Sequence, residues 1–350
     1  MMTMMNGLLR YRALQLRYCG RRICYKLGKS EYLPNGSLSI EAYNRYLYNQ
    51  IIEGEPLMVA RFGSQEARAT AWALGVERGY DRAIPRYVQK RMAVGPGFFP
   101  SNDENIRRFG DVMVESAESL DSLAYWDSFM QEYLLEEICP DSVVTTYLEN
   151  LEPYRYQAAP WSKALEGKKV LVVHPFASTI EKQYARREGI FANTNVLPDF
   201  KLKTIVPPQT IAGTIDDRFA NWFEALDYLK DAVAEESFDV SIIGCGAYGF
   251  PLAAFVKTMG KQAIHLGGGL LRCCLELKEG VGILKRSRGS SITGIGRVQT
   301  KARSQLELLR LKTAVTGDCV WTANGVAFLG AVHILGYGTI ERWRHNYQEC

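Results

Sequence analysis

The chain has 350 residues, of which 47% are hydrophobic and 23% are charged, a composition typical of globular proteins with a buried core. No apolar run approaches the roughly 18–20 residues of a membrane-spanning helix, and the apolar start is too short for a signal peptide before the first arginines interrupt it. The eight cysteines have irregular spacings without a zinc-ligand pattern, which indicates reduced thiols and a cytoplasmic location.

The net charge of +4 hides an uneven distribution along the chain. Residues 1–29 carry seven basic and no acidic side chains, and residues 269–350 carry twelve basic and six acidic ones. The body between them has 23 basic and 32 acidic residues, a net charge of −9, which argues against a nucleic-acid-binding protein. Residues 1–34 form a basic arm that mixes arginines with leucines and tyrosines. This pattern favours either peripheral contact of residues 1–29 with the inner face of a membrane or a helix packed on its own domain.

Residues 35–150 have the pattern of an N-terminal α/β half. A helix is predicted from Ser39 to about Ile52, followed by a short buried strand over residues 56–63 that ends in a glycine turn. Further helices are predicted from about Ser64 to Leu74, over residues 102–118 and over residues 128–138. Residues 151–164 are rich in proline and aromatic side chains and are predicted to connect this half to the next one.

Residues 165–268 alternate apolar runs with helical segments. Strands are predicted over residues 169–176, 200–206, 238–243 and 262–266, with helices over residues 178–188, 222–235 and 250–259. Such alternation predicts right-handed crossovers and a mostly parallel sheet. The predicted fold class is therefore α/β, with a Rossmann-like parallel sheet half at about 165–268 and an N-terminal α/β half that contributes to the same crevice.

A glycine-rich loop lies between a predicted strand and a predicted helix. Gly244, Gly246 and Gly249 match the pattern G-x-G-x-x-G, and the backbone of the loop, Ala247 included, could approach a phosphate at a helix N-terminus. A dinucleotide site also needs an acidic residue at the end of the next strand, where this sequence has residues 264–266, Ile-His-Leu. The loop can also be read as a methyltransferase glycine motif, and for that motif the same acidic residue is missing here. The alternative that the glycines only permit close helix–strand packing stays open.

Polar residues at strand ends are the other candidates, because open α/β sheets bind ligands there. His174 and His265 each follow an apolar run and are predicted to face one crevice, although a histidine at a strand end is often structural. Arg61 and Glu66 flank the turn at Gly63. They form either a pair that binds phosphate and provides a metal ligand or base, or a local salt bridge at a helix end.

These segments resemble a known family. Residues 61–66, Arg-Phe-Gly-Ser-Gln-Glu, are similar to the arginine-x-glycine-aspartate-x-glutamate turn of GT-D-type glycosyltransferases. Residues 172–176, 190–193, 243–249 and 262–267 recur in order in bacterial proteins of that type. Residues 151–154, 160–177 and 242–254 are similar to one bacterial branch that carries the motif IIGCGAYGFPLAA. The resemblance covers about residues 35–268.

The resemblance implies a glycosyltransferase that transfers a sugar from a nucleotide sugar, a UDP-sugar, to a glycan or lipid-linked acceptor in surface polysaccharide synthesis. Glu66 is then the predicted catalytic residue, either as base or as ligand of Mn²⁺ or Mg²⁺. Arg61, Gly63, His174, His265 and the glycine loop are the predicted nucleotide-sugar site. Ser64 stands where the family has its metal-binding aspartate, and a single carboxylate holds a divalent ion poorly. A non-catalytic nucleotide-sugar-binding protein and an NAD-dependent oxidoreductase are the alternatives.

The resemblance stops at Gly268, and residues 269–350 diverge. Read from the third base of the Gly269 codon, these residues can be encoded so that the shifted frame gives ATQMLFGIKGRRW, as in the bacterial branch. Two later segments give family-like sequence at the same offset, and the last of them ends in a stop codon. We therefore predict a frameshifted tail without a selected core pattern. The alternative is a divergent C-terminal domain.

Overall fold

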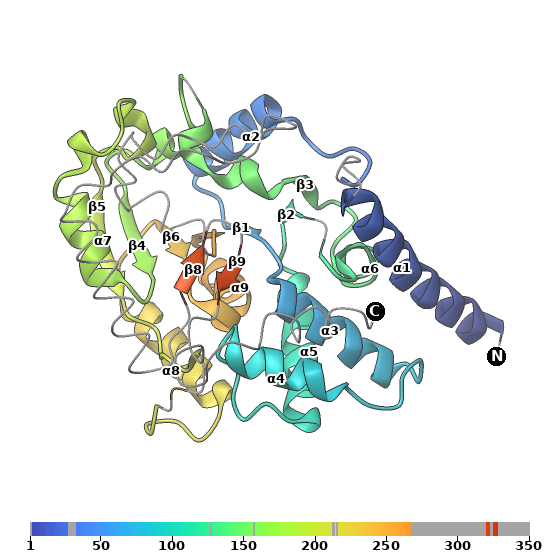
Figure 1. Cartoon of the computed structure of the whole chain (residues 1–350). Coiled ribbons are helices and arrows are strands. Elements are labelled where there is room, and N and C mark those ends of the chain that lie inside the picture. Colours follow the sequence, from blue (N-terminus) through green and yellow to red (C-terminus); the bar gives the residue numbers. More distant parts are fainter. Residues whose placement is uncertain are drawn as a thin grey trace, which may run out of the picture.

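The apolar runs of the sequence form one seven-stranded sheet in the computed structural model of the chain (Figure 1). The structure describes residues 2–26 and 33–267, apart from residues 127, 157, 212, 213 and 215, together with residues 320–322 and 325–327. In chain order the strands of this sheet are β1 (Leu57–Ala60), β2 (Ser122–Tyr125), β3 (Val144–Tyr147), β4 (Lys169–Val173), β5 (Lys201–Ile205), β6 (Val240–Ile243) and β7 (Gln262–His265).

All paired strands of this sheet run parallel, in the order β3-β2-β1-β7-β6-β4-β5. Strands β1–β3 come from residues 35–150 and strands β4–β7 from residues 165–268. The two segments join where β1 pairs with β7, with Val59 opposite Ile264. The predicted α/β class with a parallel sheet is therefore confirmed, and both halves of the chain contribute to the same sheet.

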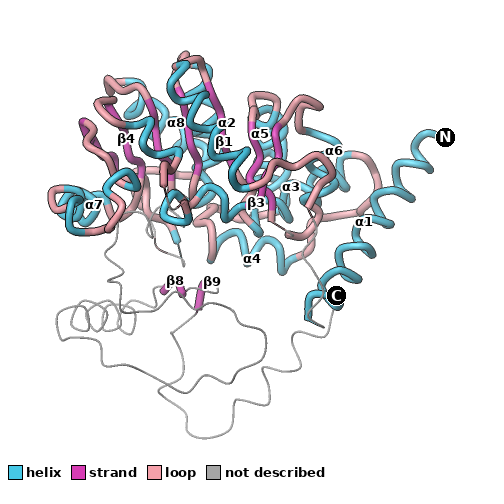
Figure 2. Tube along the Cα trace, turned by 90° about the horizontal axis from the view of Figure 1, so that it is seen from above, coloured by secondary structure: helices cyan, strands magenta, loops and turns pink. Residues whose placement is uncertain are grey.

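Helices cover both faces of the sheet (Figure 2). Helices α2 and α7 pack on one face, and α3, α5, α8 and α9 pack on the other. The short connector after β3 forms 3₁₀ turns rather than a regular helix. The helices are α1 (Met2–Lys26), α2 (Ile40–Glu53), α3 (Ser64–Glu77), α4 (Arg86–Val94), α5 (Asp103–Ala117), α6 (Gln131–Ile138), α7 (Ala177–Tyr184), α8 (Trp222–Ala234) and α9 (Gly249–Thr258).

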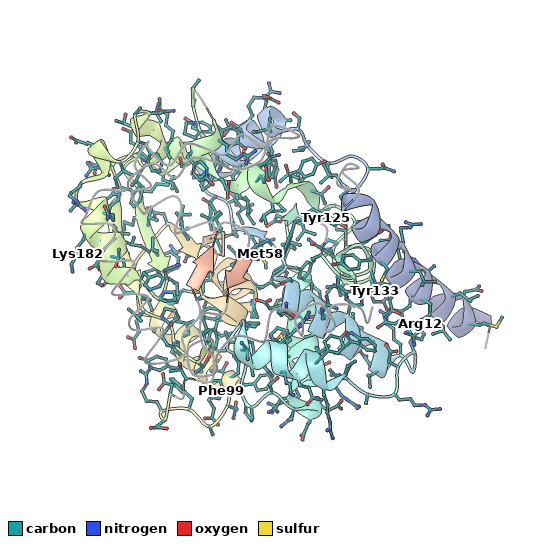
Figure 3. All side chains as sticks on the ribbon, viewed as in Figure 1. Arg12, Met58, Phe99, Tyr125, Tyr133 and Lys182 are labelled. Atoms are coloured by element: carbon teal, nitrogen blue, oxygen red, sulfur yellow. The ribbon has the colours of Figure 1, made fainter. Side chains whose placement is uncertain are left out.

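Two hydrophobic cores lie on opposite faces of the sheet because successive residues of a strand point to opposite sides. In β1, Met58 belongs to the core under α3 and α9, while Val59 belongs to the core under α2 and α7. Met58 lies near the middle of the molecule (Figure 3). Burial of both faces explains why the central strands consist of almost continuous apolar residues.

The connections between strands reverse direction at one place in the sheet. The crossovers from β1 to β2 and from β6 to β7 use helices on the face of α9, whereas the crossover from β4 to β5 uses α7 on the other face. β4 and β6 are parallel neighbours, but the chain leads from β4 to β5 towards one edge of the sheet and from β6 to β7 towards the other edge. In open α/β sheets a ligand crevice forms at such a point, beyond the carboxyl ends of the strands.

The basic N-terminal arm forms the long helix α1, which packs on the chain's own body. Tyr11 and Leu14 are buried, and the Tyr11 hydroxyl donates to Asp81. Arg12 pairs with the same Asp81 carboxylate at 2.6 Å. For the described residues 2–26, the structure therefore shows the second alternative, a helix packed on its own domain.

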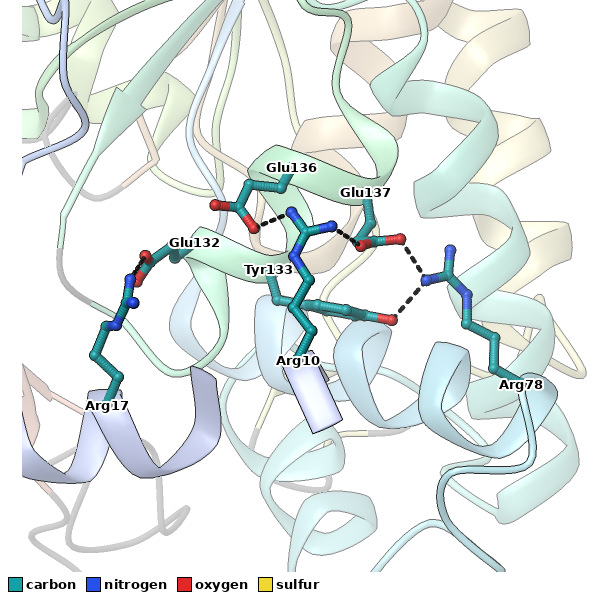
Figure 4. Close-up of polar contacts among 7 residues, drawn as sticks. All are labelled: Arg10, Arg17, Arg78, Glu132, Tyr133, Glu136 and Glu137. Atoms are coloured by element: carbon teal, nitrogen blue, oxygen red, sulfur yellow. Dashed lines mark hydrogen bonds and ion pairs between the residues drawn. The ribbon is translucent and has the colours of Figure 1, made fainter. Parts of the chain in front are cut away.

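Most of the remaining α1 arginines form ion pairs with acidic residues of α6 (Figure 4). Arg10 reaches both Glu136 and Glu137, at 2.5 and 3.1 Å. Arg17 and Arg21 both reach Glu132, each at 2.6 Å, and the Glu132 side chain is only 5% exposed. The two guanidinium groups of α1 are therefore the countercharges of this buried carboxylate.

Most predicted elements are confirmed with small shifts at their ends, including α2, α3, α5, α8 and α9. Strands β2 and β3 and helix α4 were absent from the sequence prediction. Strand β2 is only four residues long and begins with a serine, so its sequence has no clear apolar run. The Ser122 hydroxyl is nevertheless buried, because it is hydrogen-bonded to the hydroxyl of Tyr43. The predicted frameshifted tail lies outside the described residues, apart from the antiparallel pair β8 (Val320–Thr322) and β9 (Gly325–Ala327).

Removing both partners of Glu132 should destabilise the protein strongly. We expect Arg17→Ala combined with Arg21→Ala to lower the free energy of unfolding by about 3 kcal/mol, because a buried carboxylate then loses its countercharges. The matched control is Arg10→Ala, which breaks a mostly exposed pair and should cost less than about 1 kcal/mol. Urea unfolding measures both values, and equal losses would show that α1 is not anchored at Glu132.

Candidate functional site

Four turns meet at the carboxyl edge of the sheet. They follow β1 (residues 61–63), β7 (residues 266–267), β6 (residues 244–248) and β4 (residues 174–176). Because these strands are neighbours, segments about 200 residues apart in the chain become adjacent in space. Helices α3 and α9 begin at this edge, so their free amide groups favour a negatively charged ligand there.

Arg61 lies at the centre of this edge. Its guanidinium is packed over Gly267, where an added Cβ would lie 2.0 Å from Nη2, and the φ of +57° at Gly267 favours glycine there. Burial lowers the pKa of Arg61, and the nearby charge of Glu66 opposes this shift. Among the described residues the guanidinium makes no hydrogen bond or ion pair. A half-buried cation in this state is a suitable binding point for an anion.

The carboxylate of Glu66 turns back over the start of α3. Its Oε2 would lie 2.1 Å from a Cβ on Gly63, which places the carboxylate over the first turn of the helix. Burial raises the pKa of Glu66, while the charge of Arg61 and the nearby backbone amides of Glu66 and Gln65 oppose this shift. The predicted local salt bridge is not a direct contact in the described part of the chain. Glu66 instead acts as an electrostatic cap, because its carboxylate lies in the first turn of α3, where the helix dipole favours negative charge.

His265 is buried beneath the glycine loop. A Cβ on Gly249 would lie 2.3 Å from its Nε2, which gives the last glycine of the motif a packing role. The backbone of Arg61 lies beside the ring, yet neither ring nitrogen makes a well-aligned hydrogen bond to a described residue. Burial, and then the charge of Arg61, hold the pKa of His265 well below its usual value. The ring is therefore neutral at neutral pH.

The glycine loop also packs against a strap formed by residues 95–100. Gly246 has a φ of +61°, and an added Cβ would lie 2.8 Å from the Pro96 carbonyl oxygen. The same oxygen accepts the amide of Ala247 at 3.2 Å, and the Gly244 amide donates to the Val173 carbonyl. Two of the three motif glycines thus have internal packing roles, and several loop amides are already bonded. Phosphate contact by this loop remains a prediction.

The strap was not among the predicted site segments. Its Gly97 carbonyl accepts the Thr210 hydroxyl at 2.6 Å, and its Phe99 carbonyl accepts the Trp222 amide at 2.7 Å. It therefore joins the turns after β5 and β6 at the edge of the site. The cluster of glycine and proline in residues 95–100 was the available sequence signal, because such residues mark turns.

His174 has a local structural contact. Its Nδ1 accepts the backbone amide of Phe176 at 3.0 Å, in the turn that leads into α7. Burial lowers the pKa of His174 to about 4. His174 and His265 lie on either side of β6 and make different contacts, so the structure does not show them converging on one group. Arg61, Gly63, Glu66 and His265 are the predicted residues that it brings together.

The described residues do not fit a divalent metal ion at the Gly63 turn. Ser64 offers a hydroxyl in place of a carboxylate, and the single carboxylate of Glu66 is packed over Gly63. No group of three or more histidine, cysteine or acidic residues in the described part of the chain has an arrangement that could hold a metal.

The chain is an α/β protein whose all-parallel sheet carries a polar site at its carboxyl edge. No protein-family model and no curated protein matches it. Among solved structures it is similar to a selenomethionine-substituted domain of unknown function 1792, with 15% identity and a TM-score of 0.38 over 66% of this chain and 77% of that one.

Two further structures have the same kind of description. One, a domain of unknown function 1792 described as having a distinct glycosyltransferase fold, shares 15% identity over 65% of this chain and 82% of that one, with a TM-score of 0.36. The other is described as a new glycosyltransferase from Streptococcus sanguinis and shares 14% identity over 66% of this chain and 80% of that one, with a TM-score of 0.34. No helix among the described residues has the length and apolar character needed to cross a membrane.

The low pKa of His174 makes stability depend on pH. Because the folded state disfavours the protonated ring, stability from this group is present above the usual histidine pKa and is lost as pH falls towards about 4. We expect the free energy of unfolding to fall by about 2 kcal/mol between pH 7 and pH 5 from this residue. His174→Asn keeps an acceptor for Phe176 and should remove that part of the pH dependence, as measured by urea unfolding. An unchanged pH slope in the variant would contradict this assignment.

Proposed function

We propose that the chain is a glycosyltransferase that uses a nucleotide sugar, a UDP-sugar, and transfers the sugar to a glycan or lipid-linked acceptor in surface polysaccharide synthesis. The observation that carries this proposal is the guanidinium of Arg61 at the carboxyl edge of the sheet, which has no partner among the described residues. It lies between the start of α3 and the buried ring of His265. A cation and two helix N-termini at one edge suit the diphosphate of a nucleotide sugar.

The chemistry follows from where charge develops during transfer. When the bond between the sugar carbon and the diphosphate oxygen breaks, the leaving diphosphate gains negative charge. Arg61 and the helix amides stabilise that charge without moving, because the fold already holds them in place. Glu66, whose pKa is raised by burial, takes the proton of the acceptor hydroxyl as the new bond forms. The neutral His265 ring lies beside the Arg61 backbone and adds no charge to the site.

A non-catalytic nucleotide-sugar-binding protein is the second candidate. It is favoured by one observation: the Glu66 carboxylate already caps α3, and Ser64 replaces the aspartate implied by the family resemblance. An NAD-dependent oxidoreductase is favoured only by the glycine motif. Strand β7 ends in His265 and Leu266 without the acidic residue that would hold a nicotinamide-nucleotide ribose.

Ligand binding distinguishes these candidates. UDP or a UDP-sugar at 100 times its Kd should raise the free energy of unfolding by about 2.7 kcal/mol, whereas NAD should give no stabilisation. Arg61→Gln should weaken UDP binding about 10–100-fold, because a hydrogen-bonded charge is lost. Isothermal titration, with and without Mn²⁺, measures both effects.

The control for Arg61 is Arg45→Gln, a change at an exposed arginine of α2 that should leave UDP binding unchanged. Stabilisation by NAD with no response to any nucleotide sugar would instead assign the chain to the oxidoreductases.

Glu66→Gln separates catalysis from helix capping. Glutamine is nearly isosteric with glutamate but carries no charge, so the variant should fold and bind UDP while turnover falls by about 100-fold or more. Because burial raises the pKa of Glu66, its ionised form disfavours folding at neutral pH, and the variant should be more stable than the wild type there. That gain should disappear as pH falls below the usual glutamate range. Thermal unfolding across pH and a sugar-transfer assay measure these effects, and normal turnover would leave Glu66 with the capping role alone.

A further inference from the structure

Helix α4 presents an exposed face that carries only positive charge. Residues 82–102 contain four basic residues and no acidic one, within a body that is acidic overall. Three of the basic residues, Arg86, Lys90 and Arg91, lie on α4 and are exposed. At 100° per residue they share one side of the helix with Tyr87, opposite the buried Val88 and Met92.

These charges have no acidic partners in the described part of the chain. No ion pair involves Arg86, Lys90 or Arg91, and the nearby Asp103 is occupied by Arg107 and by the amide of Ile84. The arginines of α1 differ in this respect, because each one whose side chain is described pairs with an acid of the body. Of the two basic segments, α4 is the one whose described charges remain available to an external partner.

The arrangement on α4 is electrostatically unfavourable for the isolated protein. Arg86 and Lys90 are separated by four residues on a helix, so like charges are neighbours. Arg86 also lies in the first turn, where the helix dipole disfavours a cation, and no acid stands in that turn. An unfavourable cluster on a well-packed helix indicates a role in binding an anionic partner.

A tyrosine lies at the centre of the basic face. Tyr87 is 43% exposed, and its ring centroid lies 5.9 Å from the guanidinium carbon of Arg68 and 5.7 Å from that of Arg91. A tyrosine has an apolar body and a polar tip, a combination found at the boundary between membrane and water. The cationic charges follow one side of a helix instead of converging on a point, which suits many headgroups better than a single phosphate.

We propose that the exposed face of α4, formed by Arg86, Tyr87, Lys90 and Arg91, docks on an anionic lipid surface. The strap that follows α4 contacts the glycine loop, so a membrane bound there would lie beside the carboxyl edge of the sheet. Figure 2 shows α4 along that edge of the body. This contact differs from one made by residues 1–29, and it does not depend on which reaction the site performs.

The test is co-sedimentation of the full-length protein with vesicles. Vesicles of phosphatidylcholine with about one third phosphatidylglycerol should bind the protein at about 0.1 M salt, where the Debye length is about 10 Å, and release it at about 1 M. Pure phosphatidylcholine should not bind it. Arg86→Glu, Lys90→Glu and Arg91→Glu together should lower the partition coefficient at least about 100-fold, because each basic residue near the surface contributes about fivefold.

The matched control reverses three exposed, unpaired charges elsewhere: Arg45→Glu, Lys182→Glu and Lys201→Glu. Lys182 lies on the side of the molecule opposite α1 (Figure 3), and this control should retain binding. Equal losses in both triple variants, or no vesicle binding by the wild type, would overturn the proposal. It would also be overturned if Leu9→Ser with Leu16→Ser, exposed positions on α1, abolished binding that the α4 variant retained.

A thermal measurement on a single variant complements the vesicle assay. Arg86→Glu removes a like-charge neighbour and places an acid in the first turn of α4, so it should raise the thermal midpoint by about 1–3 °C. The same variant should bind anionic vesicles more weakly. A lower midpoint would show that Arg86 serves the stability of the fold, which would contradict a role in docking.

Discussion

The pairing of β1 with β7 is the interaction on which the rest of the structure depends. It joins two strands more than 200 residues apart and turns two separate groups of strands into one sheet. The Gln262 side chain reinforces this junction by donating to the Gln50 and Glu55 carbonyls. Because the strands are parallel, the junction also brings their carboxyl ends together. Arg61 contacts Gly267 and lies near His265 only because this register exists.

The glycine loop shows why a sequence motif does not by itself define a ligand. The pattern from Gly244 to Gly249 fits phosphate-binding loops, and yet the close approach at Gly246 is made by the Pro96 carbonyl and the one at Gly249 by a histidine ring. Glycine is required in both cases for the same physical reason, the lack of a Cβ. The identity of the approaching group is a tertiary property. The polar centre of the edge is consequently the Arg61 turn, with the glycine loop packed beside it.

The strands with continuous apolar runs, such as β4, β6 and β7, were predictable because both faces of a central parallel strand are buried. Strands β2 and β3 were not predictable, because they contain the polar residues Ser122 and Thr146. The hydroxyl groups of these residues are buried with hydrogen-bond partners that are distant in sequence. The turn at Gly63 and the polar character of its neighbours were also predictable from local sequence. The proximity of Arg61 to His265 was expected only from the family resemblance, because strand order is decided by long-range pairing that no local pattern encodes. The capping role of Glu66 could be read from its place in the first helical turn, but its burial could not.

The position of β7 has a consequence for how the chain is made. This strand is the last of the sheet to leave the ribosome, and it takes the central place between β1 and β6. At a synthesis rate of 5–20 residues per second, β1 waits roughly 10–40 s with one edge unpaired before its neighbour is available. During that interval the nascent chain holds an open, apolar strand edge of the kind that recruits other chains. Protection of this edge by chaperones or by the neighbouring helices thus becomes a requirement for synthesis of the protein at high concentration.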